Sequence, residues 1–138
     1  MLKTAGRSAR HNHSMAHRSG VVQLVIDVPG EGHDEELTFW EGALGQALPN
    51  RERFPEFSGD VLPNGMGLLV QRLGDGPARV HFDIHASDVA AEVARLEALG
   101  AQVVQTHPVW TVMRDPAGLV FCVVIDQQLD DTNSRQWD

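Results

Sequence analysis

The sequence contains one pattern of secondary-structure signals twice, and this repeat constrains the fold more than any other feature. Each copy starts with a short apolar stretch, continues with a helix-like run that ends in Leu-Gly, and closes with a glycine followed by apolar residues. Self-similarity of this kind indicates a repeated supersecondary unit. The matching segments are residues 22–28 and 80–86, residues 44–45 and 99–100, and residues 67–73 and 118–124.

Alignment of the two copies brings polar residues into equivalent positions. Laying Gly67 on Gly118 places Gln71 on Cys122, four residues after the glycine in each copy. Laying residues 22–28 on residues 80–86 places Gln23 on His81. Each copy is therefore predicted to form a strand, a helix and then shorter strands.

The best-defined strand opens the second copy. Its apolar and polar residues alternate strictly, which is typical of a half-buried strand. We expect one face to join the core and the opposite face to carry chemistry. The core face holds Val80, Phe82 and Ile84, and the polar face holds His81, Asp83 and His85.

Both predicted helices have recognisable ends. In residues 33–44, three acidic residues at 34–36 suit the positive end of the helix dipole, and Gly45 suits a left-handed cap. Ser87 or Asp88 can cap the second helix, whose apolar residues recur at three- and four-residue steps. Both helices are predicted to pack one apolar side on a sheet.

The remaining segments set the predicted boundaries. Residues 1–20 are polar and lack hydrophobic periodicity, so we expect a disordered tail, and Met15 is an alternative start. Residues 49–64 predict two short or irregular strands, and residues 74–77 predict a short linker. We expect one domain at 21–126, with module one at about 21–74 and module two at about 79–126, followed by a polar tail at 127–138.

The charge limits the classes of binding partner that we expect, and the cysteine content indicates the cellular compartment. The net charge is -8, and without the four basic residues of the first 20 the rest of the chain has 7 basic and 19 acidic residues, a net of -12. An acidic body repels phosphate, so we expect no nucleic-acid partner. No apolar run is long enough for a membrane span. A single cysteine and the lack of a convincing export signal predict a cytoplasmic protein.

The second copy resembles the vicinal oxygen chelate superfamily, and more narrowly its uncharacterised glyoxalase-like members. The resemblance is carried by Val80-His81-Phe82-Asp83-Ile84-His85, by the helix that ends Leu99-Gly100-Ala101, and by Trp110-Thr111-Val112-Met113-Arg114-Asp115-Pro116-Ala117-Gly118 with its apolar closing strand. It covers about residues 21–126. It implies an α+β fold of two βαβββ modules that form a cup-shaped mixed sheet with helices on the outer face.

The resemblance also implies a metal position in the cup. In metal-dependent members the first and last strands of each module supply His, Gln or Glu ligands. The four positions here are Gln23, Gln71, His81 and Cys122, of which Gln23 and His81 are the suitable ligands. Gln71 offers only a neutral amide oxygen, and Cys122 is either a thiolate ligand or a small buried hydrophobic residue. We therefore expect an incomplete metal site.

Other candidate residues have more than one interpretation. His85 shares a face with His81, and the two are the candidate catalytic residues; His85 is a second ligand, a general base or a polar residue of the pocket wall. Phe54, Phe57 and Trp110 line a pocket for a flat apolar ligand, or they fill the core or a dimer interface.

The favoured function is a glyoxalase/bleomycin-resistance-like protein that binds a small molecule in the cup without a complete metal site. The alternative is a metal-dependent lyase, isomerase or dioxygenase that acts on vicinal oxygens, with a divalent metal as cofactor. A third interpretation is an interaction module, because fold alone does not fix function. The family resemblance implies a homodimer.

Overall fold

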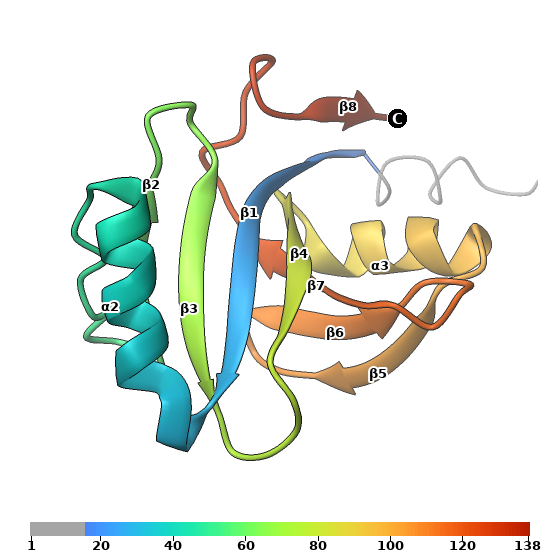
Figure 1. Ribbon diagram of the computed structural model, residues 1–138. Coiled ribbons are helices and arrows are strands. Elements are labelled where there is room, and N and C mark those ends of the chain that lie inside the picture. The colour runs from blue at the N-terminus through green and yellow to red at the C-terminus, as the bar shows by residue number, and fades with distance from the viewer. Residues whose placement is uncertain (1–15) are drawn as a thin grey trace, which may run out of the picture.

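The computed structural model describes residues 16–138, which form one mixed sheet of eight strands with helices on its outer side (Figure 1). The strand order is β2-β3-β1-β4-β7-β6-β5, and β8 pairs with β1. The elements are β1 (His17–Pro29), η1 (Gly30–Gly32), α2 (His33–Leu44), β2 (Phe57–Val61), β3 (Gly67–Leu73), β4 (Arg79–Ala86), α3 (Val89–Ala98), β5 (Gln102–Thr106), β6 (Trp110–Arg114), β7 (Val120–Ile125) and β8 (Arg135–Trp137).

The predicted two-module architecture is confirmed. In the first module β1 pairs in parallel with β3, and in the second β4 pairs in parallel with β7. Antiparallel pairing of β1 with β4 joins the modules within one chain. The first module has one full strand fewer than the second, because the position of its second strand holds only an isolated bridge between Asn50 and Ser58. Of the two strands predicted in residues 49–64, only β2 is a full strand.

The strand register corrects the alignment of the two copies. Asp27 lies opposite Gln71, and Asp83 lies opposite Cys122. Asp27 and Asp83 therefore occupy equivalent positions, and the equivalent of Gln23 is Arg79 rather than His81. The sequence alignment is two residues out of register. A strand repeats its faces every two residues, so this shift leaves the residues on the correct face but in the wrong place.

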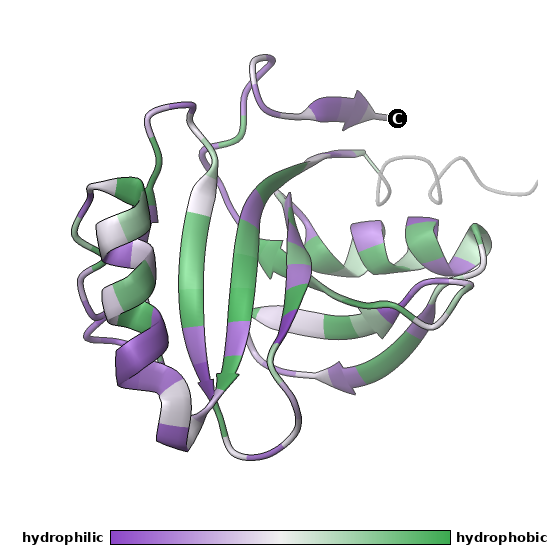
Figure 2. Ribbon diagram, in the orientation of Figure 1, coloured by the Kyte–Doolittle hydropathy of each residue, from purple (hydrophilic) through white to green (hydrophobic). Residues whose placement is uncertain are grey.

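Two apolar clusters hold the helices on the sheet. The first lies under α2 and includes Ile26, Val70 and Leu48, while the second lies under α3 and includes Met113 and Val123. Figure 2 shows hydrophobic residues along most of β1 and β3 and an alternating pattern along β4. No helix within residues 16–138 is long and apolar enough to cross a membrane.

The helix ends form as the sequence predicts. Gly45 adopts a left-handed conformation (φ 65°) after α2, and its N–H donates to the Glu41 carbonyl. Asp88 caps α3 by accepting a hydrogen bond from the Ala91 N–H. These two ends fix the points at which the chain returns to the sheet.

The outer face of β4 differs from its prediction. Val80 and Phe82 were expected in the core, but their side chains are 62% and 55% exposed. The two helices cover other parts of the sheet: α2 packs against β1 and β3, and α3 packs against β7, the start of β1, β5, β6 and the end of β4 at Ala86. The outer side of β4 between them is left uncovered.

The two ends of the described chain pair with each other. β1 begins at His17, four residues before the expected boundary, because β8 pairs with its first residues. His17 Nε2 lies 3.1 Å from Glu92 Oε1, and Arg95 stacks on Trp137 at 3.8 Å. Burial acts to raise the pKa of Glu92, but hydrogen bonds from Arg95, Ser19 and His17 outweigh it and lower the pKa. The expected disorder of residues 1–15 lies outside the described residues.

Leu48→Ala is predicted to destabilise the fold by about 2–5 kcal/mol, because Leu48 is 1% exposed and fills the cluster under α2. Leu119→Ala makes the same chemical change at a residue that is 67% exposed, and we expect a loss within about 0.5 kcal/mol. Urea unfolding of both variants measures the difference. Equal losses would contradict the assignment of the core.

Candidate functional site

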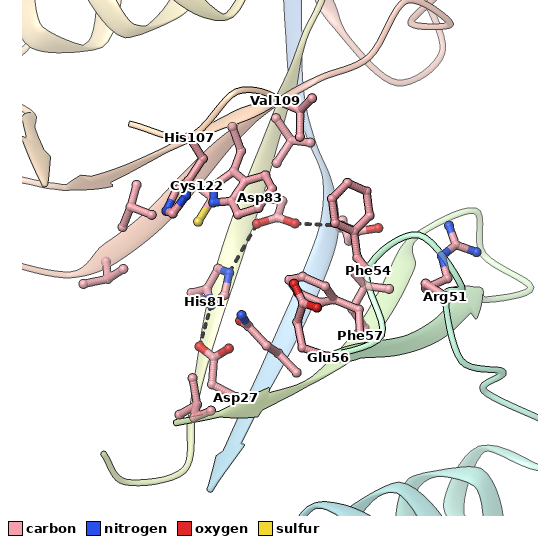
Figure 3. A pocket seen from close by; sticks show the side chains of 18 of the residues that line it. Asp27, Arg51, Phe54, Glu56, Phe57, His81, Asp83, His107, Val109 and Cys122 are labelled. Atoms are coloured by element: carbon pink, nitrogen blue, oxygen red, sulfur yellow. Dashed lines mark hydrogen bonds and ion pairs between the residues drawn. The ribbon is translucent and has the colours of Figure 1, made fainter. Parts of the chain in front are cut away.

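The concave face of the sheet surrounds a cavity of about 630 Å³ (Figure 3). β1, β3, β4 and β7 supply its floor, while the segment before β2 and the start of β6 supply its wall. The structure places all eight predicted site residues around this one cavity. They are Gln23, Phe54, Phe57, Gln71, His81, His85, Trp110 and Cys122.

His81 lies at the centre of the floor between two carboxylates (Figure 3). Its Nδ1 is 2.6 Å from Asp27 Oδ2, and its Nε2 is 3.3 Å from Asp83 Oδ1. The side-chain amide of Gln23 donates to Asp83 Oδ2 at 2.7 Å. A chain of polar contacts therefore runs from β1 to β4 and back to β1.

This centre is buried and strongly polarised. His81, Asp27 and Asp83 are all buried, and Arg79 Nε lies 3.6 Å from Asp27 Oδ2. Burial alone would lower the pKa of His81, but hydrogen bonding to Asp27, Asp83 and Cys122 outweighs it and raises the pKa to about 11. The ring is therefore an imidazolium at neutral pH, which donates a hydrogen bond from Nδ1 to Asp27 and forms an ion pair with Asp83 through Nε2.

All four metal positions carried over by resemblance line the cavity, and one of them already has a hydrogen-bonding role. Gln23 holds the Asp83 carboxylate, so its amide supports another side chain. The donor atoms that do come together belong to His81, Asp83 and Cys122, and they all lie within 4.8 Å of one another. The group contains His81 and Cys122 from the positions implied by resemblance, together with Asp83, to which the resemblance gave no ligand role.

His85 is separated from His81 along β4. The two residues are four positions apart, or about 13 Å at the rise of a strand, so they cannot bind one ion together. His85 Nδ1 is 2.8 Å from Asp126 Oδ2. Its Nε2 is buried without a hydrogen-bond partner among the residues that the structure describes, and the ring lines the cavity.

Aromatic side chains form the opposite wall. The rings of Phe54 and Trp110 meet edge to face with centroids 5.9 Å apart, and His107 stacks on Trp110 at 4.5 Å. Phe54 and Phe57 come from the segment before β2 and its first residue, so both modules contribute to this wall. The wall offers a flat apolar surface that faces a charged floor.

Sequence reasoning missed the two carboxylates of the centre. Asp83 alternates with His81 and His85 on one face, and strand periodicity puts Asp27 on the same face as Gln23. What it lacked was the register that brings Asp27 to His81 across two strands. The cavity lining also includes residues that no pattern selected, namely Arg51, Glu56, Arg79 and His107.

The chain matches the model of the glyoxalase-like domain family over residues 23–124, and it belongs to that family. The match to this family model, together with the shared fold, supports the vicinal oxygen chelate superfamily that the sequence resemblance predicted. No curated protein sequence matches the chain.

Solved structures share this fold at low sequence identity. Methylmalonyl-CoA epimerase from Mycobacterium tuberculosis is 14% identical with a TM-score of 0.56, covering 77% of this chain and 87% of its own. The Streptomyces coelicolor epimerase in complex with 2-nitronate-propionyl-CoA is 14% identical with a TM-score of 0.53, covering 78% and 96%. A Legionella pneumophila structure described as NAD-dependent benzaldehyde dehydrogenase is 11% identical with a TM-score of 0.60, covering 75% and 96%. At these identities the likeness shows the fold alone.

Asp27→Asn is predicted to lower the pKa of His81, because it removes the carboxylate charge at Nδ1. The pKa of His81 is about 11 in the folded protein, against an ordinary value of 6.5. Protonation of His81 therefore contributes to the free energy of unfolding in full below pH 6.5, and this contribution is lost as the pH rises toward 11. In the Asp27→Asn variant, the contribution of His81 to the free energy of unfolding should therefore be lost at a lower pH than in the natural protein. NMR titration of the His81 ring and urea unfolding across this range measure both effects.

Asp34→Asn is the matched control, since Asp34 contacts His33 at an exposed position away from the cavity. It should leave the titration of His81 unchanged. An identical His81 titration in Asp27→Asn and the natural protein would contradict the assigned hydrogen bond.

Proposed function

We propose that the protein binds a small organic molecule in the cup, and that it does so without the four-position metal set implied by the superfamily resemblance. The observation that carries this proposal is a cavity of about 630 Å³ with an aromatic wall facing a polar floor. Pockets for small molecules commonly have volumes of roughly 300–1,000 Å³ and combine apolar walls with a few placed polar groups.

The floor favours a ligand that carries a hydrogen-bond donor. Asp27 Oδ1 is buried without a partner among the described residues, while Oδ2 of the same carboxylate accepts from His81. The Asp27 and Asp83 carboxylates both line the cavity, so a ligand hydroxyl, amide or ammonium group could donate a hydrogen bond to this floor. The flat part of such a ligand would lie against Phe54 and Trp110.

The charges around the cavity favour a ligand without a large net charge. Three carboxylates line it, from Asp27, Glu56 and Asp83, and three cations oppose them, from Arg51, Arg79 and the His81 imidazolium. The two sets balance. This supports a neutral or zwitterionic aromatic compound over a polyanion.

A metal-dependent lyase, isomerase or dioxygenase is the second candidate. The observation in its favour is the group formed by His81, Asp83 and Cys122. A divalent ion held there would act as a Lewis acid on oxygens of a molecule in the cavity.

Trp110→Ala is predicted to weaken ligand binding at least about tenfold, because it removes the centre of the apolar wall. A panel of aromatic compounds with hydroxyl, amide or amine groups can be screened by thermal shift, and binders quantified by calorimetry. Trp40→Ala is the control, since Trp40 packs with the cluster under α2. A panel without binders, together with a native mass that shows no bound molecule, would contradict the proposal.

We also propose that the chain forms a homodimer through the outer face of β4, where Val80 and Phe82 are exposed. Phe82→Glu should then produce a monomer in sedimentation equilibrium, while Leu99→Glu, at another exposed residue, should not. A monomeric natural protein at micromolar concentration would refute the dimer.

A further inference from the structure

We propose that residues 126–137 form a strap that closes the His85 end of the cup and opens locally to expose His85. The strap follows β7 and ends in β8, which pairs with the first residues of β1 (Figure 1). The inference rests on the proposed function only for the consequence of opening, which is to expose a wall residue of the ligand cavity.

The middle of the strap lies directly on the concave side of β1. Gly20 is paired with His85 in the β1–β4 ladder, so both residues face the cup. A Cβ at Gly20 would lie 2.2 Å from the carbonyl oxygen of Asn133, so only glycine allows this close approach. Arg18, two residues earlier on the same side of β1, forms an ion pair with Asp131. The strap therefore packs on the strand next to His85.

The beginning of the strap holds His85 itself. Asp126 Oδ2 lies 2.8 Å from His85 Nδ1, and the Asp126 N–H donates to the carbonyl of Ala86. The Gln127 side chain donates to the carbonyl of Ser87 at 3.0 Å. The His85 side chain lines the cavity but is only 16% exposed. Its position in the cavity wall is thus tied to the strap.

The end of the strap is anchored on the opposite side of the sheet. The Trp137 ring stacks on the Arg95 guanidinium of α3 at 3.8 Å, and its Nε1 donates to Ser19 Oγ at 2.8 Å. Arg95 also pairs with the fully buried carboxylate of Glu92. The strap therefore contacts the cup side with its middle and the helix side with its end, so it wraps around the start of β1.

The composition of the strap suits a segment that opens while the cup stays folded. Within residues 127–138, only Leu129 and Trp137 have large apolar side chains, and neither is fully buried. Segments with few buried apolar contacts open locally at a lower free-energy cost than the core. The β1–β4 ladder continues to Asp27, well beyond Gly20, so it does not depend on the strap.

Gly20→Ala releases the strap in the full chain, because the added methyl group collides with the Asn133 carbonyl. Amide hydrogen exchange in residues 127–138 should accelerate at least about tenfold, and modification of His85 by diethyl pyrocarbonate at constant pH at least about fivefold. Both are measured by mass spectrometry of peptides. His107, which stacks on Trp110, is an internal control whose modification rate should not change.

Gly42→Ala is the matched control variant, since nothing lies within 4 Å of a Cβ added there. It should leave exchange in residues 127–138 and modification of His85 as in the natural protein. Unchanged exchange in β3 and an unchanged circular dichroism spectrum show that the cup of each variant is folded.

A locked strap should have the opposite effect and does not require release. Arg18 lies opposite Gln136 in the β1–β8 pair, where Cα atoms stand about 4.5–5.5 Å apart, a separation that a disulfide can span. In the chain with Arg18→Cys and Gln136→Cys, the oxidised form should modify His85 at least about fivefold more slowly than the reduced form. Peptide mapping confirms that Cys122 is not part of the disulfide.

Either of two results would overturn the strap. One is equal exchange of residues 127–138 in Gly20→Ala and the natural protein, and the other is a His85 modification rate that neither release nor locking changes. None of these readouts needs a bound ligand. If these changes occur and the aromatic panel has no binder, the strap stands and the proposed function falls; binders without these changes give the reverse.

Discussion

The antiparallel pairing of β1 with β4 is the contact on which the cup depends, because it joins the two modules into one sheet. The side-chain contacts of the centre cross the same pair of strands. Asp27 on β1 reaches His81 on β4, and Gln23 on β1 reaches Asp83 on β4. The backbone ladder and the polar centre therefore specify the same register, and a slip of the strands would break both.

The buried charges of Asp27, His81 and Asp83 stabilise one another, and each is costly without the others. A buried carboxylate is costly without a partner, and two of them lie here within reach of a single imidazole. The imidazolium compensates both, while Arg79 and Gln23 supply further contacts to the same carboxylates. Loss of His81 would leave Asp27 with Arg79 as its remaining cation and Asp83 with only the neutral Gln23 amide, so this position is under structural constraint.

Local patterns in the sequence were sufficient for most of the fold. The helix ends at Gly45 and Asp88 and the alternation in β4 follow from the preferences of single residues and from strand periodicity. The register between the two copies could not be predicted from these patterns. Shifting one copy by two residues leaves every side chain on the same face of its strand, so both alignments fit the pattern equally well. That ambiguity hid the roles of Asp27 and Asp83, although each lies on the same strand face as a predicted site residue. The exposure of Val80 and Phe82 was also beyond local patterns, since it depends on where two distant helices pack.

The pairing of β8 with the first residues of β1 has a consequence for chain connectivity. His17 lies opposite Trp137, so the two ends of the described chain are neighbours in one sheet. The modules are joined elsewhere by the short segment between β3 and β4. A chain linked at residues 138 and 16 and opened in that segment would place the second module before the first and keep every strand pairing. The cup therefore depends on which strands pair with each other. It does not depend on which module comes first along the polypeptide.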